Sequence, residues 1–415
     1  MPAISVVIPT RNRPEFVRSA LESLRCQTFG DFEVLIVDNH TGVPCRHVVD
    51  EIGDGRFRYL TPDVPIPMHE NWELGVTHAS GAYVAVLIDK TVLKPRALQV
   101  LAECANRFDA DLVSWPTDSY SVEAPSRGVC YRWAEPPTEP ALFDGHDEIR
   151  RRFTLDVRRG AEGRKYFWGK ICFGAYRRDL ITRIRSTAGR VFFPITPDYT
   201  SMLSALALAR TPVDAGQACI IQCLSDVSNG WNVAHKPEYA REFLAGIDPS
   251  GKIIEALPIP GLFTSVHNLV CYDYLSMQRR LADHFPGVQV DVSNLLKRVA
   301  EDLYDVHWAG SGLKDAHYGV LEHHLAQLRP DQKAAHRRAV RRYMVERIQF
   351  QMQRLVRRSV TRMPMGESAL QILRPLVRAL GGRDHSGAPP PRYFDSVLSA
   401  AAASDTPKTL RSAAR

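Results

Sequence analysis

Residues 4–41, "ISVVIPTRNRPEFVRSALESLRCQTFGDFEVLIVDNHT", decide the expected fold, because they hold two short β-branched runs with a helix signal between them. The first run ends at Thr10. Pro14 then stands where the first residue of a helix is favoured, and apolar residues follow at helical spacing as far as Leu24. The second run ends in Asp38. Two buried strands joined by a helix predict a parallel sheet with helices on its faces.

The same alternation continues beyond this stretch. "RFRYLTP" indicates a third strand, "NWELGVTHAS" a helix and "AYVAVLID" a strand that ends in Asp89. In such sheets ligands bind beyond the carboxyl ends of the strands. Thr10, Asp38 and Asp89 are all placed at such ends, so the pattern predicts a ligand cleft there.

The overall composition limits the class of protein. The chain of 415 residues is 45% hydrophobic and 24% charged, which is typical of a soluble globular protein. It has no apolar run of about 18 residues, and its N-terminus lacks the basic and apolar regions of a secretory signal. The eight cysteines form no disulfide or zinc framework, so we expect reduced thiols and a cytoplasmic protein. The net charge of +7 suits an anionic ligand or an anionic membrane surface, and we expect no nucleic-acid partner.

The character of the sequence changes along the chain. Strand and helix signals alternate to about residue 240, and helical patterns dominate after it. We expect an α/β domain at residues 1–240, a helical region at 241–380 and a disordered tail at 381–415, where proline and small residues accumulate. Residues 119–140 are rich in proline, glutamate and tyrosine without periodicity, which predicts a long loop over the site.

Residues 337–362 form the most basic segment, with nine arginines against one acid, Glu346. As a helix, this segment would separate an apolar face from a basic face: Met344, Val345, Ile348, Met352, Leu355 and Val356 against Arg347, Arg354, Arg357 and Arg358. Two interpretations stay open. Either the helix lies on anionic lipid at the inner face of the membrane, or its basic side is the solvated face of an ordinary packed helix.

The quoted N-terminal stretch resembles the opening of the family 2 glycosyltransferases, the inverting enzymes built on the GT-A fold. The likeness continues through "ENWELGVTHASGAYVAVLID", where the family has an asparagine, small residues and a strand that ends in acids. It implies an α/β GT-A fold with a mainly parallel central sheet, followed here by an α-helical C-terminal region. It also implies transfer of a hexose from a nucleotide-diphosphate sugar, expected to be a UDP-sugar, to a hydroxyl of a glycan or lipid-linked acceptor with inversion.

The resemblance assigns the nucleotide to residues at the strand ends. Asp38 matches the family acid that accepts a hydrogen bond from a uracil-type ring N–H, a task that suits a carboxylate because it offers only acceptors. Pro9 and Thr10 match the turn against which base and ribose pack. Asn12 and Arg13 would line this turn.

Four further positions receive roles from the resemblance or from residue chemistry. Asp198, in "FFPITPDYTSML", matches the general base that removes the proton of the attacking hydroxyl. Asn71 lies where the family places an asparagine near the nucleotide. Trp168 and Trp231 would offer rings for stacking on an acceptor sugar, with ordinary packing as the alternative.

The metal motif departs from the family. Most members carry Asp-x-Asp where this chain has Asp89, Lys90 and Thr91. In an extended segment positions 89 and 91 share one side, so Thr91 replaces a hard oxygen ligand of the cation that neutralises the departing diphosphate. We expect a weakly bound Mn²⁺ or Mg²⁺ held by Asp89, Thr91 and His235. The alternative is fixed positive charge from Lys90 or Arg13.

A binding or scaffold protein that kept the fold and lost catalysis is the competing function. Thr91 favours it, whereas Asp38 and Asp198 argue against it. A dinucleotide-binding oxidoreductase and a nucleotidyltransferase are disfavoured, because no glycine-rich phosphate loop follows the first strand.

Overall fold

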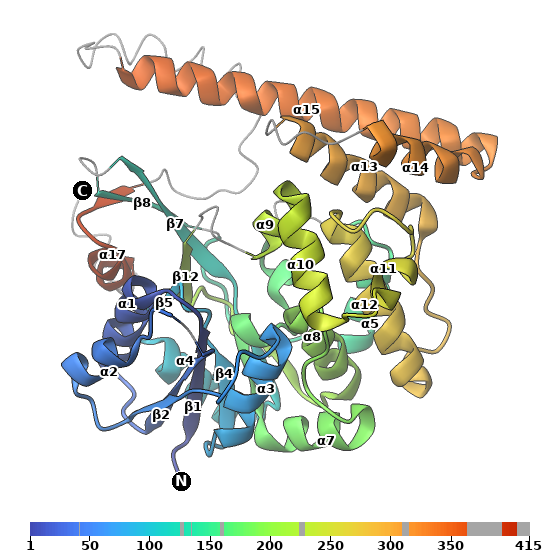
Figure 1. The fold of residues 1–415 in the computed structure, drawn as a ribbon. Coiled ribbons are helices and arrows are strands. Elements are labelled where there is room, and N and C mark those ends of the chain that lie inside the picture. Colours follow the sequence, from blue (N-terminus) through green and yellow to red (C-terminus); the bar gives the residue numbers. More distant parts are fainter. Residues whose placement is uncertain are drawn as a thin grey trace.

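The computed structural model describes residues 1–40, 42–124, 128–133, 135–157, 162–223, 229–308, 315–362 and 392–404. In these ranges the chain forms two β-sheets with flanking helices, and the C-terminal half adds a layer of helices (Figure 1).

The larger sheet is built around the two strands of the quoted stretch. Within the described ranges its strand order is β3-β2-β1-β4-β10-β6-β11-β9. β1 pairs in parallel with β2 and β4, and β2 pairs in parallel with β3, whereas β10 and β9 run antiparallel to their neighbours. The expected α/β fold with a mainly parallel central sheet is therefore confirmed. The strands are β1 (Ile4–Thr10), β2 (Phe32–Asp38), β3 (Phe57–Leu60), β4 (Tyr83–Val86), β6 (Leu112–Ser114), β9 (Ala141–Leu142), β10 (Gly174–Arg177) and β11 (Pro212–Asp214).

Helices connect and cover these strands. α1 has Pro14 at its first position and buries the apolar side of its amphipathic sequence. α3 packs closely on β1 and β2 because Gly75 has no side chain: a Cβ there would lie 2.3 Å from Val7 Cγ1 and 2.9 Å from Val37 Cγ2. The helices are α1 (Pro14–Arg25), α2 (Arg46–Ile52), α3 (Met68–His78), α4 (Ala97–Phe108), α5 (Gly145–Phe153), α7 (Arg178–Ala188) and α8 (Pro197–Leu208).

A second sheet replaces the loop expected at residues 119–140. β7 and β8 pair as an antiparallel hairpin, and β12 and β5 extend the sheet beyond β7. The expectation was wrong because the segment is ordered by strand pairing and burial: Tyr120 pairs with Tyr131, and both are buried together with Val129 and Cys130. The strands are β5 (Thr91–Leu93), β7 (Thr117–Ala124), β8 (Gly128–Arg132) and β12 (Ile220–Cys223).

Part of the expected disordered tail is folded. β13 (Arg392–Phe394) pairs antiparallel with β8, and α17 (Val397–Ser404) follows it beside α1 (Figure 1). Ala400 and Ala401 are buried in a small core with Tyr131. Their small side chains let the helix lie close to the sheet, so the alanine run is a packing surface. The other residues of the predicted tail lie outside the described ranges.

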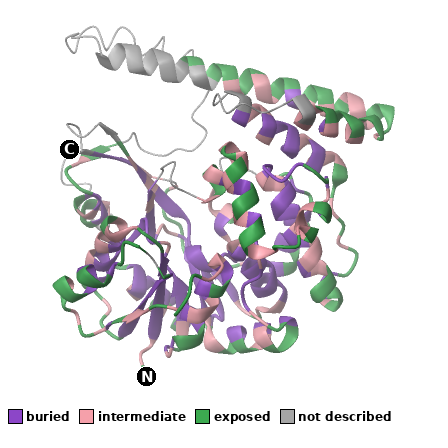
Figure 2. Ribbon diagram, in the orientation of Figure 1, coloured by how far each residue is buried: buried purple, intermediate pink, exposed green. Residues whose placement is uncertain are grey.

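The expected C-terminal helices are present and share the core of the α/β part. One hydrophobic cluster extends from Ile4 in β1 to Val340 in α15, and Figure 2 shows buried residues throughout the contact between the two parts. Because this core crosses residue 240, the domain division there stays a prediction. The helices are α9 (Asn229–His235), α10 (Pro237–Ile247), α11 (Lys252–Glu255), α12 (Val266–Arg280), α13 (Val292–Trp308), α14 (Asp315–Ala326) and α15 (Pro330–Arg362).

α15 lies along the outer edge of the helical layer, and its faces differ from those expected (Figure 1). Arg347 lies on the packed face, where its Nε is 3.0 Å from Asp305 of α13. Val345, Ile348 and Met352 are instead exposed to solvent, at 53%, 41% and 58%. The expected separation was wrong because packing on α13 selects the side that carries Val340 and Met344.

The remaining residues of the two expected faces, Arg354, Leu355, Val356, Arg357 and Arg358, have side chains outside the described part of the chain. Among the described helices, none has the length and apolar character needed to cross a bilayer.

Candidate functional site

Two of the three expected strand-end residues lie side by side at the carboxyl edge of the larger sheet. Pro9 and Thr10 end β1, Asp38 ends β2, and Thr10 pairs with Asp38 in the parallel register. The backbone carbonyl of Thr10 accepts a hydrogen bond from the N–H of Asn39 at 3.0 Å. The predicted position of this edge is therefore confirmed.

Asp38 has one engaged oxygen and one free oxygen. Its Oδ2 accepts hydrogen bonds from the backbone N–H of Cys45 at 2.7 Å and from the Tyr59 hydroxyl at 2.8 Å. Its Oδ1 is buried and has no hydrogen-bond partner among the described residues. Burial and the charge of Asp38 raise the pKa of the Cys45 thiol to about 12, so this thiol is not a reactive thiolate. A buried, unpaired acceptor is costly unless a donor meets it, so the Oδ1 atom marks a place for a ligand N–H.

Two asparagines shape the same edge. The side-chain N–H of Asn71, in the first turn of α3, donates to the carbonyl of Val37 at 3.0 Å, and its Oδ1 is also buried without a partner in the described ranges. Asn12 has φ of 57°, a left-handed conformation that asparagine tolerates better than most residues. Its Oδ1 accepts from the backbone N–H of Val43 at 3.2 Å, which ties the loop after β2 to the loop after β1.

Asp89 does not end a strand. β4 ends at Val86, and Asp89 and Lys90 form a turn that leads into β5 of the second sheet. Positions 89 and 91 therefore do not share one side of an extended segment, as was expected. The side chain of Thr91 is buried where β5 pairs with β12. The strand was expected to be longer because the apolar run continues past the point where the chain leaves one sheet for the other.

Asp89 is held by two residues from the end of β1. Its Oδ2 accepts from the Thr10 hydroxyl at 3.0 Å, and its Oδ1 lies 3.3 Å from the guanidinium of Arg13. Burial raises the pKa of Asp89, while the charge of Arg13 opposes that shift. Burial lowers the pKa of Lys90, and the charge of Arg13 lowers it further. Two cationic residues, Arg13 and Lys90, are thus close to the Asp89 carboxylate at this turn.

These residues do not fit a resident divalent cation held by the protein alone. A hard cation takes several oxygen ligands, and both oxygens of Asp89 already meet protein donors. His235 ends α9, where its Nδ1 lies 2.9 Å from the carbonyl of Trp231 and its ring stacks on that tryptophan. In the part of the chain that the structure describes, no three His, Cys, Asp or Glu side chains gather as a metal site.

Asp198 lies in the first turn of α8, as the sequence predicts, and its carboxylate is 27% exposed. Its Oδ2 is 3.4 Å from the ammonium of Lys170, a side chain that is only 3% exposed. The same ammonium lies over the rings of Tyr199 and Tyr166, 3.5 Å and 4.7 Å from their centroids. The charge of Lys170 lowers the pKa of Tyr166, whereas burial raises that of Tyr199. A buried cation in an aromatic setting therefore holds this carboxylate.

The two tryptophans differ in their surroundings. Trp168 donates its indole N–H to Asp214 Oδ2 at 3.0 Å, and its ring stacks on Phe143 with 4.3 Å between centroids. One ring face of Trp168 is thus engaged within the protein. Trp231 is 37% exposed on α9, next to His235. Their roles in acceptor binding stay predictions.

Sequence reasoning missed Tyr59 and Lys170. Each binds a predicted acid, but they stand 21 and 28 residues from their partners, Asp38 and Asp198. The segment "YFWGKICF" around Lys170 has the composition of a buried strand, and only the charge of a lysine within it hinted at a partner.

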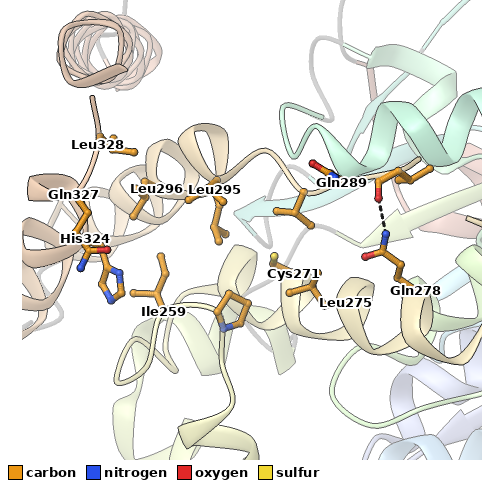
Figure 3. Close-up of a pocket in the computed structure, with 14 residues that line it drawn as sticks. Ile259, Cys271, Leu275, Gln278, Gln289, Leu295, Leu296, His324, Gln327 and Leu328 are labelled. Carbon is orange, nitrogen blue, oxygen red and sulfur yellow. Dashed lines mark hydrogen bonds between the residues drawn. The ribbon is translucent and has the colours of Figure 1, made fainter. Parts of the chain in front are cut away.

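One cavity lies away from these residues. It occupies about 520 Å³ between α12, α13 and α14 (Figure 3). Its lining is mainly apolar, with Leu275, Leu295 and Leu296 inside and His324 and Gln327 at one side. The cavity contains none of the predicted site residues.

Comparison with known proteins finds similarity to one family in the N-terminal part of the chain. A family model described as glycosyl transferase family 2 matches residues 5–181. The GalNAc(5)-diNAcBac-PP-undecaprenol beta-1,3-glucosyltransferase of Campylobacter jejuni is 32% identical over 109 residues, which are 26% of this chain and 35% of that protein. The putative glycosyltransferase EpsH of Bacillus subtilis is 24% identical over 211 residues, 47% of this chain and 51% of that protein. The matches to these relatives thus span about a third to a half of their length.

Among solved structures, a crystal structure of S. aureus TarS in complex with UDP-GlcNAc aligns with 73% of this chain and 83% of that chain. The TM-score is 0.43 and the sequence identity is 13%.

Proposed function

Since residues 5–181 match the model of the family 2 glycosyltransferases, we propose that the protein transfers a sugar from a UDP-sugar to a hydroxyl group of a glycan or lipid-linked acceptor. The proposal for the acceptor is supported by the C. jejuni relative, whose name specifies a glycan on a polyprenyl diphosphate. The observation that supports a UDP-sugar as the donor is the free Oδ1 of Asp38 at the end of β2. It would accept the ring N–H of the base, while Asn71 offers a second free acceptor nearby on α3.

The reaction follows as a direct displacement. Asp198 takes the proton of the acceptor hydroxyl, and the acceptor oxygen attacks the anomeric carbon from the face opposite the diphosphate. The bond between that carbon and the diphosphate oxygen breaks, and UDP leaves with the electron pair. One sugar–oxygen bond forms as another breaks. Because the new bond forms on the face opposite the leaving group, the anomeric configuration inverts. General-base assistance of this kind is worth about 100- to 10,000-fold.

The leaving diphosphate needs positive charge. Arg13 and Lys90 stand beside Asp89 at the turn, so two cations and one carboxylate leave a net positive site when all are ionised. This set supplies fixed charge without reorganisation, as electrostatic catalysis requires. The Mn²⁺ or Mg²⁺ expected from the family would add charge neutralisation when bound, and it stays a prediction for this chain.

Replacing the proposed base tests the function. Asp198→Asn should lower the release of UDP from the best substrate in a panel of UDP-sugars by about 100-fold or more, with UDP binding by calorimetry unchanged. Asp179→Asn is the matched control, because Asp179 is an exposed acid in the first turn of the neighbouring helix α7.

The control should behave as the unaltered protein. If no UDP-sugar in the panel is bound or turned over by the unaltered protein, the scaffold alternative replaces the enzyme. If Asp198→Asn turns over donor at the original rate, Asp198 is not the base.

We also propose that the outward face of α15 contacts an anionic membrane surface. Val345, Ile348 and Met352 are exposed there, and exposed arginines precede them along the same helix. The arginines on the described part of this outward side are Arg337, Arg338, Arg341 and Arg342. Apolar side chains flanked by arginines are typical of interfacial helices. Such a contact would keep a lipid-linked acceptor close to the enzyme.

Vesicle sedimentation tests this contact. The protein should bind phosphatidylcholine vesicles only when phosphatidylglycerol is included. Changing Arg338, Arg341 and Arg342 to glutamine should weaken binding by roughly 100-fold at low salt, at about 1 kcal/mol for each arginine. Replacing Lys333, Arg329 and Arg280, which lie outside this face, should have less effect. Equal binding to neutral and anionic vesicles would contradict the proposal.

A further inference from the structure

The segment that leads into α8 is held in a strained conformation. Ile195 has φ of 77°, in the left-handed region that a β-branched residue rarely occupies. Such a residue costs on the order of 1–3 kcal/mol, so its surroundings must hold it there. Its side chain is only 4% exposed, in a cluster with Val233 of α9, Leu244 of α10 and Leu269 of α12. The C-terminal helices therefore supply the packing that holds Ile195.

Thr196, the next residue, is bound by the same helical layer. It occupies the N-cap of α8, where a threonine hydroxyl ordinarily accepts a bond from the first helical turn. The hydroxyl makes no such bond here. It donates instead to Asp273 Oδ2 at 2.6 Å, and the backbone N–H of Thr196 donates to the same oxygen at 2.8 Å. Asp273 lies on α12 and is 2% exposed.

The other end of the segment is held by the α/β part. Glu73 of α3 accepts hydrogen bonds from the backbone N–H groups of Val191 and Phe192, at 3.0 Å and 3.1 Å. The segment between α7 and α8 is therefore fixed by two carboxylates from two different layers. The bond to Asp273 is the nearer one to Asp198, with Thr196 only two residues away.

We propose that Asp273 is a positioning residue for Asp198, acting through Thr196 to fix the start of α8 and the direction of the Asp198 carboxylate. The inference rests on the proposed role of Asp198 as the base. It gives the C-terminal helical layer a function in the reaction: α12 completes the support of the catalytic acid that the α/β part presents. Lys170 holds the carboxylate itself, whereas Asp273 holds the backbone beneath it.

Paired variants test the proposal with UDP release from the best UDP-sugar and with UDP binding. Asp273→Ala removes the acceptor, and kcat should fall about 10- to 100-fold because small displacements of a reacting group have effects of this size. KM and the Kd of UDP should stay unchanged. Asp273→Asn keeps an oxygen acceptor for both bonds of Thr196, so it should restore most of kcat. Asp283→Asn, an exposed acid just after α12, is the control and should change nothing.

Thr196 gives a second test if Asp273→Ala fails to fold. Thr196→Val keeps the shape and the backbone bond but loses the hydroxyl bond, and kcat should fall about 10-fold. Thr196→Ser should recover it. Hydrogen exchange at residues 196–200 should quicken in the valine variant and stay unchanged in the serine variant.

The outcomes separate this proposal from the function on which it rests. If Asp198→Asn abolishes UDP release while Asp273→Ala and Thr196→Val keep the original kcat, the positioning role is overturned and the function stands. A parallel loss of kcat and UDP binding in these variants would also overturn it, because that pattern indicates general destabilisation. If Asp198→Asn itself keeps full turnover, the proposed function fails first.

Discussion

The two sides of the candidate site are held in different ways. The edge formed by Thr10, Asp38 and Asp89 is bound by partners from the first 90 residues, such as Arg13 and Tyr59. Asp198 depends instead on Lys170 and, through Thr196, on Asp273 of the C-terminal helices. The proposed donor edge is thus held by residues from one short part of the chain. The proposed base is supported by residues spread over more than 100 positions.

Nucleotide binding and turnover should therefore respond to changes in different parts of the molecule. Changes in the C-terminal helices should lower turnover and leave nucleotide binding intact. Changes at the strand ends should weaken nucleotide binding first. Variants on the two sides of the site test whether nucleotide binding and turnover change separately.

Asp38→Ala should weaken UDP binding at the strand ends. The change removes the free acceptor and the anchor of Cys45 and Tyr59, and the Kd of UDP should rise by about 10- to 100-fold, as expected for a lost hydrogen bond to a charged group. Calorimetry with UDP measures the change. Asp50→Ala, an exposed acid on α2, is the control. Unchanged UDP affinity in Asp38→Ala would remove Asp38 from the nucleotide site.

Lys170→Met should affect only the base side. The methionine fills a similar volume, but Asp198 loses the ammonium that holds it, so kcat for UDP release should fall about 10-fold. The Kd of UDP should stay the same. Lys252→Met changes an exposed lysine on α11 and should be neutral. A larger change in Kd than in kcat would show that Lys170 contacts the donor.

Removal of divalent cations should have a smaller effect. Because Arg13 already pairs with Asp89, EDTA should leave most of the UDP release, and added Mn²⁺ should increase it only modestly. Arg13→Gln should make turnover more dependent on Mn²⁺, since Asp89 is then free to meet a cation. Complete loss of UDP release in EDTA would show that a cation displaces Arg13 during the reaction.

Asp273 should also give stability a pH dependence, an effect separate from binding and turnover. Burial raises its pKa from 3.8 to about 8, so between these values the native state binds more protons than the unfolded state. The free energy of unfolding should therefore fall as the pH rises from 4 to 8. Asp273→Asn should make this slope shallower in urea unfolding at several pH values. An identical slope in both proteins would mean that Asp273 does not titrate in this range.

The same division explains what could be predicted from the sequence. Thr10 and Asp38 follow short β-branched runs, so the local pattern places both at the sheet edge correctly. Asp89 was misplaced because one apolar run serves two sheets, and the turn between them has no glycine or proline to mark it. Tyr120 and Tyr131 were misassigned to a loop because the composition of residues 119–140 is typical of a loop, and the pairing of the two tyrosines is not visible in the sequence.

The support of Asp198 could not be predicted. Lys170 and Asp273 stand 28 and 75 residues from Asp198, and neither lies in a pattern that indicates its partner. Asp273 sits on a helix of ordinary sequence and is buried only because α12 packs on α8. The left-handed Ile195 likewise depends on tertiary packing, since a local pattern would never place a β-branched residue there.

The docking of β13 and α17 on the second sheet has a consequence for synthesis of the chain. β8 reaches its final pairing only when residues 392–394 have left the ribosome, long after β8 itself. Until then the hairpin presents an unpaired edge, the kind of surface on which nascent chains associate. Removal of residues 392–404 should therefore reduce the yield of folded protein by acting on a sheet near the N-terminal strands.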